Sequence, residues 1–497
     1  MLPGTSATEG PIRWRACGAC LAVAFASLSA FHGAHQAMAG DPKPSREVPL
    51  FEMMAPSEPM TARQKDMMSL DMSSRATMGV SMSKTLNPVM VEKALTHGMH
   101  GDRAETPPPL LRIPLNATSS VAVRRTSITH EGDHYVWRGE VEGSGQPVTL
   151  MWWSDGHVSG SIRHGSRLFM VKGATGGMHE VVEIARRKLP PDHAPANRDI
   201  LHSMGMHQDP LVRQGDASMM RSMMEKAGMM SWPRMHPTSK ELDKLRDGPA
   251  ATPDEAPVRR SARPEIDHST AGSNAQKEDV TISLMGAYTP AVARHYEDPA
   301  RDLVALAVEE ANQSFRNSGL GHIHVKLVHT YETGYAESGT HFEHVWRFAD
   351  KGDGYMDEVH ALRDKHKAAV AVLMVHDPMG CGLATRVRAE ADEAFAVVHH
   401  ECATSTYSLA HEIGHIIGAR HDYALDDTIT PFPFGHGYVH GNRWRTMMSY
   451  KDTCNDCPRL PVWSSPSVKV RGVPAGTARH DNAKVIAEQA GRVARFR

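Results

Sequence analysis

The residues from His411 to His421 combine three histidines, a glutamate and a glycine at fixed intervals: His-Glu-Ile-Gly-His-Ile-Ile-Gly-Ala-Arg-His. At about 100° per residue, His411 and His415 would lie only about 40° apart on one face of a helix. Gly418 would end that helix and let the chain turn, so that His421 returns as a third nitrogen ligand. Three neutral imidazoles with an open fourth position are the arrangement of catalytic zinc, whereas structural zinc sites are closed.

Glu412 follows the first of these histidines, where its carboxylate can accept a proton from water on the metal. Zinc lowers the pKa of that water to about 7 and also polarises a carbonyl group. Glu412 can then pass the proton to a leaving amine, so the pattern predicts hydrolysis of peptide bonds. Chance would produce the five fixed positions roughly five times in ten thousand such chains. A second pair, His400-Glu401, has Thr404 where another histidine would be needed, and we expect no catalytic role for it.

The motif resembles the signature HExxHxxGxxH of the metzincin clan of zinc endopeptidases, and Asp422 after the third histidine is similar to its adamalysin (reprolysin) branch. The clan also has a Met-turn, a tight turn that places a methionine beneath the metal. Arg445-Thr-Met-Met-Ser-Tyr450 matches it, with Met448 at the methionine position, 27 residues after His421. By this resemblance Met448 belongs to the Met-turn.

Flanking segments resemble the bacterial peptidyl-Asp metallopeptidases and related secreted reprolysin-like enzymes. They are Cys381-Gly-Leu-Ala, Ala396-Val-Val, Tyr407-Ser-Leu-Ala and Trp463-Ser-Ser-Pro, with Gly472 and Gly476. The resemblance covers about residues 278 to 497 and implies a twisted five-stranded sheet with the zinc helix behind it. Residues 382 to 387 would form the edge strand that aligns a substrate by β-augmentation.

Two positions depart from the adamalysin pattern. Tyr450 stands where animal adamalysins have proline, as in the serralysin and astacin Met-turn, so it either ligates zinc, donates a hydrogen bond to the oxyanion, or is an ordinary packed tyrosine. The segment from Gly40 to Asn274 contains no cysteine that could block zinc, so any latency must use another ligand or steric cover.

Four arginines suggest a preference for acidic side chains next to the cut. Arg443 and Arg445 precede the Met-turn, where the clan builds the pocket for the residue after the scissile bond, and Arg386 and Arg388 lie on or beside the presumed edge strand. The alternative is that these are solvated surface arginines.

The last 220 residues contain the elements that must position this site. Strands are expected at 280–285, 323–327 and 368–375, and amphipathic helices at 303–315 and 356–362. The zinc helix would bury one face, formed by Leu409, Ile413, Ile416 and Ile417. Strands alternating with helices indicate an α/β (α+β) fold with a largely parallel sheet.

The preceding chain divides by composition. Arg13 and Arg15, an apolar run and an Ala37-x-Ala39 cleavage site predict a signal peptide over 1–39, and hence a secreted or periplasmic protein without a membrane anchor. We expect a Met-rich flexible segment at 40–109, a small β-rich pro-domain at 110–195, a linker at 196–277 and the catalytic domain at 278–497.

Cleavage after residue 39 would leave four cysteines, which in an oxidising compartment allow two disulfides in three connectivities. We favour Cys381 with Cys402 and Cys454 with Cys457. The second pair could also be a redox or zinc knuckle, although neither a βαβ context nor a second Cys pair accompanies it.

The composition of the 497 residues gives a formal charge of -2, which shows no basic excess for nucleic acid. Nineteen of the 30 methionines fall in 53–99 and 204–235, several beside histidine. Thioether and imidazole ligands suit Cu(I), so the alternative function is a periplasmic copper-binding protein that carries a protease-like domain. The sequence predicts one catalytic zinc ion and protein or peptide substrates, and leaves calcium dependence and oligomeric state open.

Overall fold

A computed structural model describes residues 47–53, 77–85, 109–116, 118–174, 177–192, 266–267 and 278–497. The predicted signal peptide lies outside the described residues, as do most of the Met-rich segment and nearly all of the linker. Among the described residues, no helix is both long enough and apolar enough to cross a membrane.

The N-terminal described segments form a ten-stranded sheet in the order β1-β4-β5-β6-β7-β8-β9-β10-β3-β2. Its centre is an antiparallel meander that includes β6, β7 and β8. Inward-facing Trp137, Leu150 and Phe169 are buried in its core. The strands are β1 Glu47–Pro49, β2 Phe51–Met53, β3 Thr77–Thr85, β4 Leu110–Asn116, β5 Ser119–Glu131, β6 His134–Val141, β7 Pro147–Trp153, β8 Val158–His164, β9 Arg167–Ala174 and β10 Met178–Ile184.

The region from residue 278 is built on a five-stranded sheet in the order β13-β12-β14-β16-β15, in which only β15 runs antiparallel to its neighbour. The expected mixed α/β class is thus confirmed. The strands are β12 Val280–Tyr288, β13 Ile323–Glu332, β14 Val370–Val375, β15 Gly382–Ala384 and β16 Phe395–His399.

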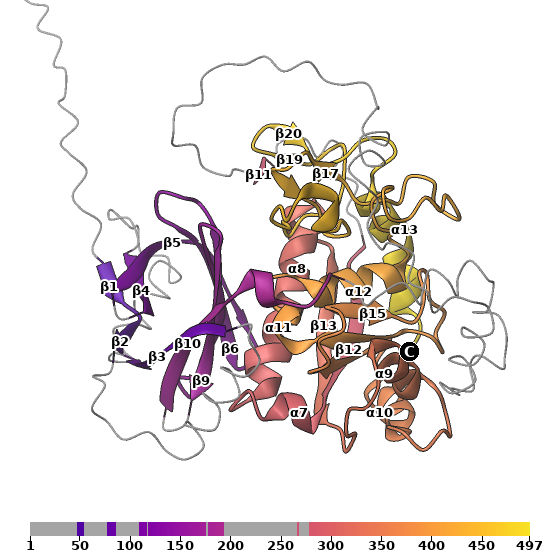
Figure 1. The fold of residues 1–497 in the computed structure, drawn as a ribbon, viewed down its shortest axis with the longest axis horizontal. Coiled ribbons are helices and arrows are strands. Elements are labelled where there is room, and N and C mark those ends of the chain that lie inside the picture. Colours follow the sequence, from indigo (N-terminus) through magenta and orange to yellow (C-terminus); the bar gives the residue numbers. More distant parts are fainter. Residues whose placement is uncertain are drawn as a thin grey trace, which may run out of the picture. The chain divides into compact units, whose positions relative to one another are not determined.

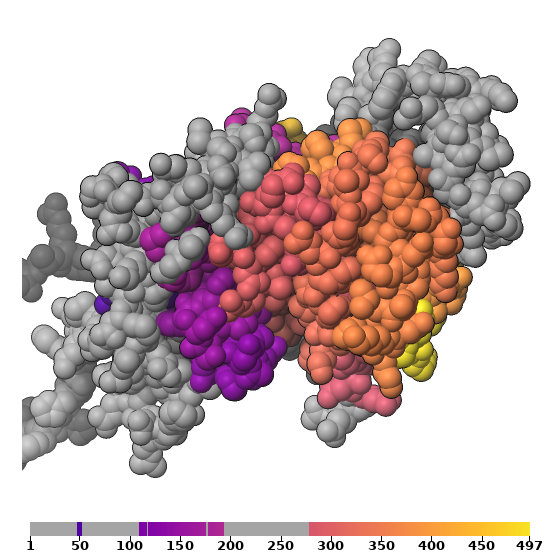
Figure 2. All heavy atoms as spheres, turned by 90° about the horizontal axis from the view of Figure 1, so that it is seen from below, coloured from indigo at the N-terminus to yellow at the C-terminus, as the bar shows by residue number. Residues whose placement is uncertain are grey.

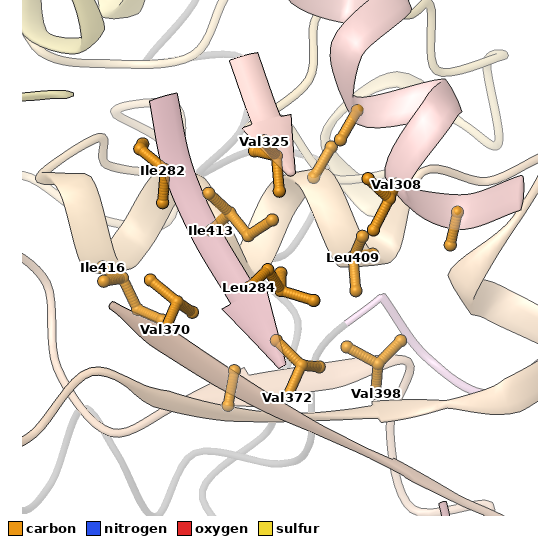
Figure 3. Packing of buried hydrophobic residues seen from close by; sticks show 14 of the residues in the cluster. Ile282, Leu284, Val308, Val325, Val370, Val372, Val398, Leu409, Ile413 and Ile416 are labelled. Atoms are coloured by element: carbon orange, nitrogen blue, oxygen red, sulfur yellow. The ribbon is translucent and has the colours of Figure 1, made fainter. Parts of the chain in front are cut away.

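Helices cover both faces of this sheet (Figure 1). The even-numbered residues of β12, such as Ile282 and Leu284, pack against α8 Leu306–Asn317, α12 Ser408–Ile417 and α13 Asn482–Ala494. The odd-numbered residues Met285 and Ala287 of β12 face the other side and pack against α9 His341–Ala349 and α10 Glu358–His366. Figure 3 shows Leu409, Ile413 and Ile416 of α12 within the first of these cores. The apolar face predicted for the zinc helix therefore anchors α12 to the sheet.

Several predicted boundaries were wrong: β12 and β13 extend beyond the expected ends, to Tyr288 and Glu332, and β14 begins at Val370. The helix expected from 303 begins earlier as a π-helical segment, Ala300–Ala305, before α8. The helix expected from 356 begins at Glu358, because Met356 has a positive φ of 50°. The edge strand expected over 382–387 ends at Ala384, and the chain then leaves β16: the Arg388 amide donates a hydrogen bond to the His415 carbonyl instead.

Both favoured disulfides are present, Cys381–Cys402 and Cys454–Cys457. The first joins the residue before β15 to the short helix α11, His400–Ala403, and so fixes the start of the edge strand. Short elements complete the fold: η2 Arg186–Lys188, α7 Pro290–Ala293, η5 Asp452–Cys454, the pair β17 Val439–His440 and β18 Trp444–Arg445, and the small sheet of β11 Ile266–Asp267, β19 Lys469–Val470 and β20 Val473–Pro474.

Candidate metal centre

The structure brings together the three histidines of the motif. His411 and His415 project from α12, which ends at Gly418 with a φ of 137°. The chain then turns back, and His421 Nε2 lies 2.8 Å from His415 Nε2 and 3.2 Å from His411 Nε2. All three side chains are buried, and one ring nitrogen of each converges on a single point. The glycine is needed at this position because a side chain rarely adopts that φ.

Backbone carbonyls set the protonation of two of these rings. His411 Nδ1 lies 2.9 Å from the Met447 carbonyl oxygen, and His415 Nδ1 lies 2.9 Å from that of Ala419. Because a carbonyl only accepts, each Nδ1 carries the proton and each Nε2 presents a lone pair. Ring orientation of this kind is typical of histidines that ligate a metal. The donor set therefore fits a divalent metal of the zinc type.

The turn at Thr446–Ser449 lies beneath α12. Met447 and Met448 are both fully buried, and the Met447 carbonyl is the one that holds His411. Gly414, between the two helical histidines, packs so closely that a Cβ there would lie 2.9 Å from Met448 Sδ. Of the two methionines, Met448 is thus the one whose sulfur packs against the helix between the two histidines.

Asp422 connects the third histidine to the end of this turn. Its Oδ2 accepts a hydrogen bond from the Tyr450 amide at 3.2 Å. Burial raises the pKa of Asp422 to about 6, although that amide and other backbone donors act in the opposite direction. The residue therefore holds the loops of His421 and Tyr450 together.

Glu412 and Tyr450 both lie at the histidine cluster. Glu412 is fully buried, and its carboxylate abuts the edge strand so closely that a Cβ on Gly382 would lie 2.5 Å from Oε1. The Tyr450 hydroxyl lies 3.0 Å from His421 Nε2. The Tyr450 hydroxyl therefore lies beside one of the three imidazole nitrogens, and its role among the alternatives stays a prediction.

The four predicted arginines separate into different environments. Arg443 is exposed, while Arg386 and Arg388 each pair at 3.2 Å with a glutamate of their own loop. Arg445 is buried and forms a salt bridge with Asp192, with an Nη2–Oδ2 distance of 3.0 Å.

The sequence did not indicate that Arg459 and Asp192 lie together with Arg445. Arg459 is buried beside Arg445, with Nη2 3.6 Å from Asp192 Oδ1. Neither Arg459 nor Asp192 belongs to a recognisable motif, and the only available signal was the end of the β-rich region at Pro190-Pro191-Asp192.

A second group of histidines, His295, His376 and His400, also lies within metal-ligand spacing. Its geometry differs from that of the first group, because the three rings are close to parallel, at 29° to 34° to one another. His400 uses both ring nitrogens in hydrogen bonds, to Tyr296 at 2.9 Å and to His376 at 3.0 Å. We interpret this group as a hydrogen-bonded stack of rings.

Comparison with known proteins agrees with the geometry. The family model described as metallo-peptidase family M12, of the reprolysin type, matches residues 278–464. A peptidyl-Asp metalloendopeptidase of Xanthomonas campestris pv. campestris is 33% identical over 342 residues, covering 68% of this chain and 67% of that protein. Two from Stenotrophomonas maltophilia are 42% and 40% identical over 222 residues, covering 44% of this chain and 53% of each relative. The chain thus spans from about half to two thirds of the length of these relatives. It belongs to the reprolysin-type metalloendopeptidases of family M12.

Proposed function

We propose that His411, His415 and His421 hold one zinc ion and that the protein uses it to hydrolyse peptide bonds within protein or peptide substrates. The observation that carries this proposal is the convergence of three imidazole nitrogens, two of them with the opposite nitrogen fixed by a backbone carbonyl. When bound, zinc would act as a Lewis acid that polarises the scissile carbonyl and lowers the pKa of a water molecule at the site.

The surrounding side chains would carry the proton transfers. Glu412 lies on the same helix as two of the histidines, and its carboxylate lies against the edge strand. There it would accept the proton of the attacking water and pass it to the leaving amine. The Tyr450 hydroxyl, 3.0 Å from His421 Nε2, can donate a hydrogen bond to the oxygen on which negative charge develops.

The strand β15 would orient the substrate. It stands at the end of the five-stranded sheet and pairs with β16 on one side, so an extended peptide can add to its other side by main-chain hydrogen bonds. Such a peptide would pass the Glu412 carboxylate, because Gly382 of β15 contacts it.

We further propose that the β-rich region is the pro-domain of a secreted precursor, joined to the catalytic domain by the linker at 196–277 and preceded by the signal peptide. Its support is a set of buried polar contacts with the helical layer, including Arg138 Nη2 to Glu309 Oε1 at 2.6 Å and Ser159 Oγ to Asp302 Oδ1 at 2.6 Å. Atoms of the two regions lie directly against each other in Figure 2. The two disulfides suit an oxidising compartment.

The preferred substrate would carry an aspartate next to the scissile bond. This preference is suggested by the names of the relatives, peptidyl-Asp metalloendopeptidases. The comparisons do not support the alternative of a copper-binding protein, and its Met-rich segments lie largely outside the described residues.

The full-length chain, purified and incubated until the precursor has processed itself, tests the proposal through two readouts, zinc content and cleavage of a peptide library. We expect about one zinc per chain, loss of cleavage on chelation and its return with added zinc. Glu412→Gln should abolish cleavage but keep zinc, whereas His415→Ala should lose both. Glu488→Gln, on an exposed side of α13, is the matched control and should change neither. Cleavage by the Glu412→Gln chain at the wild-type rate would refute the mechanism.

A further inference from the structure

The segment after β10 ends against the loop that follows the Met-turn. Asp192 accepts a hydrogen bond from the Lys451 amide at 2.7 Å and one from Arg445 Nη2 at 3.2 Å. The carbonyl of Pro191 accepts a hydrogen bond from the Cys381 amide at 2.7 Å, and that of Pro190 accepts one from Lys451 Nζ at 3.3 Å. Three consecutive residues of the β-rich region are therefore held by the catalytic region.

The two arginines around Asp192 are fixed by other groups. Arg445 donates to the carbonyls of Ser449 and Cys457, at 3.1 and 3.2 Å. Arg459 donates to the Thr406 carbonyl at 3.0 Å. Both side chains are more than nine-tenths buried. Because their positions do not depend on Asp192 alone, they form a preorganised cradle for one carboxylate.

The two buried guanidinium groups of this cradle require an anion between them. Burial acts to raise the pKa of Asp192, but Arg445, Arg459 and Lys451 outweigh it and hold that pKa well below its usual range. Burial lowers the pKa of Arg445 to about 10, and Asp192 opposes this shift. Removing the carboxylate would leave two buried guanidinium groups without their counter-charge, which is strongly unfavourable.

The cradle adjoins both parts of the catalytic site. Lys451, which binds Asp192, directly follows Tyr450, whose hydroxyl reaches His421. Cys381, which binds Pro191, directly precedes Gly382, which contacts Glu412. A peptide paired with β15 and passing Glu412 could therefore place one side chain in the same cradle.

We propose that Arg445 and Arg459 form the pocket that selects a substrate aspartate, and that Asp192 fills this pocket in the precursor as an internal substrate mimic. This inference rests on the proposed function, because it assigns the substrate side chain and the mode of latency to the same site. It also supplies a mechanism of latency that needs no pro-region cysteine. A substrate glutamine or asparagine side chain would bind weakly in this pocket, since neither neutralises the charge of the buried arginines.

Binding of a dye-labelled peptide tests the inference in the full-length, zinc-loaded Glu412→Gln chain, in which self-cleavage is prevented. The probe is a short peptide with a single aspartate, and its partner has asparagine instead. Adding Asp192→Asn should tighten binding of the aspartate peptide by about tenfold or more, because the internal competitor is removed. Binding of the asparagine peptide should change little.

Two further variants separate selectivity from packing. Arg459→Gln in the Asp192→Asn chain should remove the preference for aspartate over asparagine, while Asp133→Asn, at an exposed site of the β-rich region, should leave binding unchanged. If Asp192→Asn lowers thermal stability without creating aspartate-selective binding, Asp192 is only a structural clasp and the inference is wrong. Failure of the proposed function would look different, because the wild-type chain would then show no zinc-dependent cleavage of the peptide library, whatever the binding of the probe.

Discussion

Replacement of Asp302 by alanine gives a quantitative test of how the β-rich region is attached. Asp302 lies in the π-helical segment before α8 and is fully buried. Its Oδ1 accepts hydrogen bonds from Ser159 Oγ at 2.6 Å, His157 Nε2 at 2.8 Å and the Gly173 amide at 3.0 Å. All three donors belong to the β-rich region, so Asp302→Ala removes one acceptor and leaves three donors without it.

The expected cost follows from the burial of these groups. Ser159 is fully buried, whereas the His157 side chain is 12% exposed and can recover part of its hydration. A hydrogen bond to a charged acceptor contributes about 1.5 to 3 kcal/mol, and loss of one partner of a buried charged network costs about 3 to 5 kcal/mol. We therefore expect Asp302→Ala to lower the free energy of unfolding by about 3 to 5 kcal/mol.

Urea unfolding followed by tryptophan fluorescence measures this change, because Trp152 and Trp153 lie on β7. The Glu412→Gln background avoids self-cleavage during the experiment. The control is Asp279→Ala, which removes an exposed carboxylate from the catalytic region, where Asp302 also lies. It should change the free energy of unfolding by less than about 0.5 kcal/mol. A loss below about 1 kcal/mol for Asp302→Ala would show that these contacts do not hold the two regions together.

Three other substitutions test a buried carboxyl group, the packing beneath α12 and the position of Glu412. Burial raises the pKa of Glu310 to about 7, so the folded chain keeps a proton that the unfolded chain releases near pH 4.5. The contribution of Glu310 to stability should therefore fall by up to about 3 kcal/mol as the pH rises from 4.5 to above 7. Glu310→Gln should make the pH dependence of stability shallower between about pH 6 and 7.5, where Asp422 contributes least, as measured by urea titrations at several pH values. Gly414→Ala would place a Cβ 2.6 Å from Trp463 and should destabilise the chain by about 1 to 3 kcal/mol, measured as a lower urea midpoint. Gly382→Ala should displace the Glu412 carboxylate and lower kcat by about a hundredfold while zinc content is retained; unchanged kcat would argue against Glu412 as the base.

The parts of the site that sequence reasoning could predict are local. His411, His415 and Gly418 occupy one helix and its end, so their relation is set by helical geometry, and the apolar face of α12 packs as its periodicity predicts. The cysteine pairing could be favoured because few connectivities exist, and the strand β14 was recognisable as a continuous apolar run.

The parts that could not be predicted depend on contacts between distant segments. Asp192 and Arg445 are 253 positions apart, and no periodicity connects them. Arg445 could therefore be interpreted either as a pocket residue or as a surface cation until its burial was known. The short edge strand has a similar origin, since the chain after it forms hydrogen bonds with the end of α12, such as that from the Arg388 amide to the His415 carbonyl.

X-ray absorption at the zinc edge, recorded on the full-length Glu412→Gln chain, is the most direct test of the central claim that three histidines hold a catalytic zinc ion. We predict three imidazole nitrogens at about 2.0 to 2.1 Å and one oxygen as the fourth ligand, with one imidazole fewer, or no zinc, in the His421→Ala chain. A sulfur ligand at about 2.3 Å, or an unchanged spectrum after His421→Ala, would contradict it.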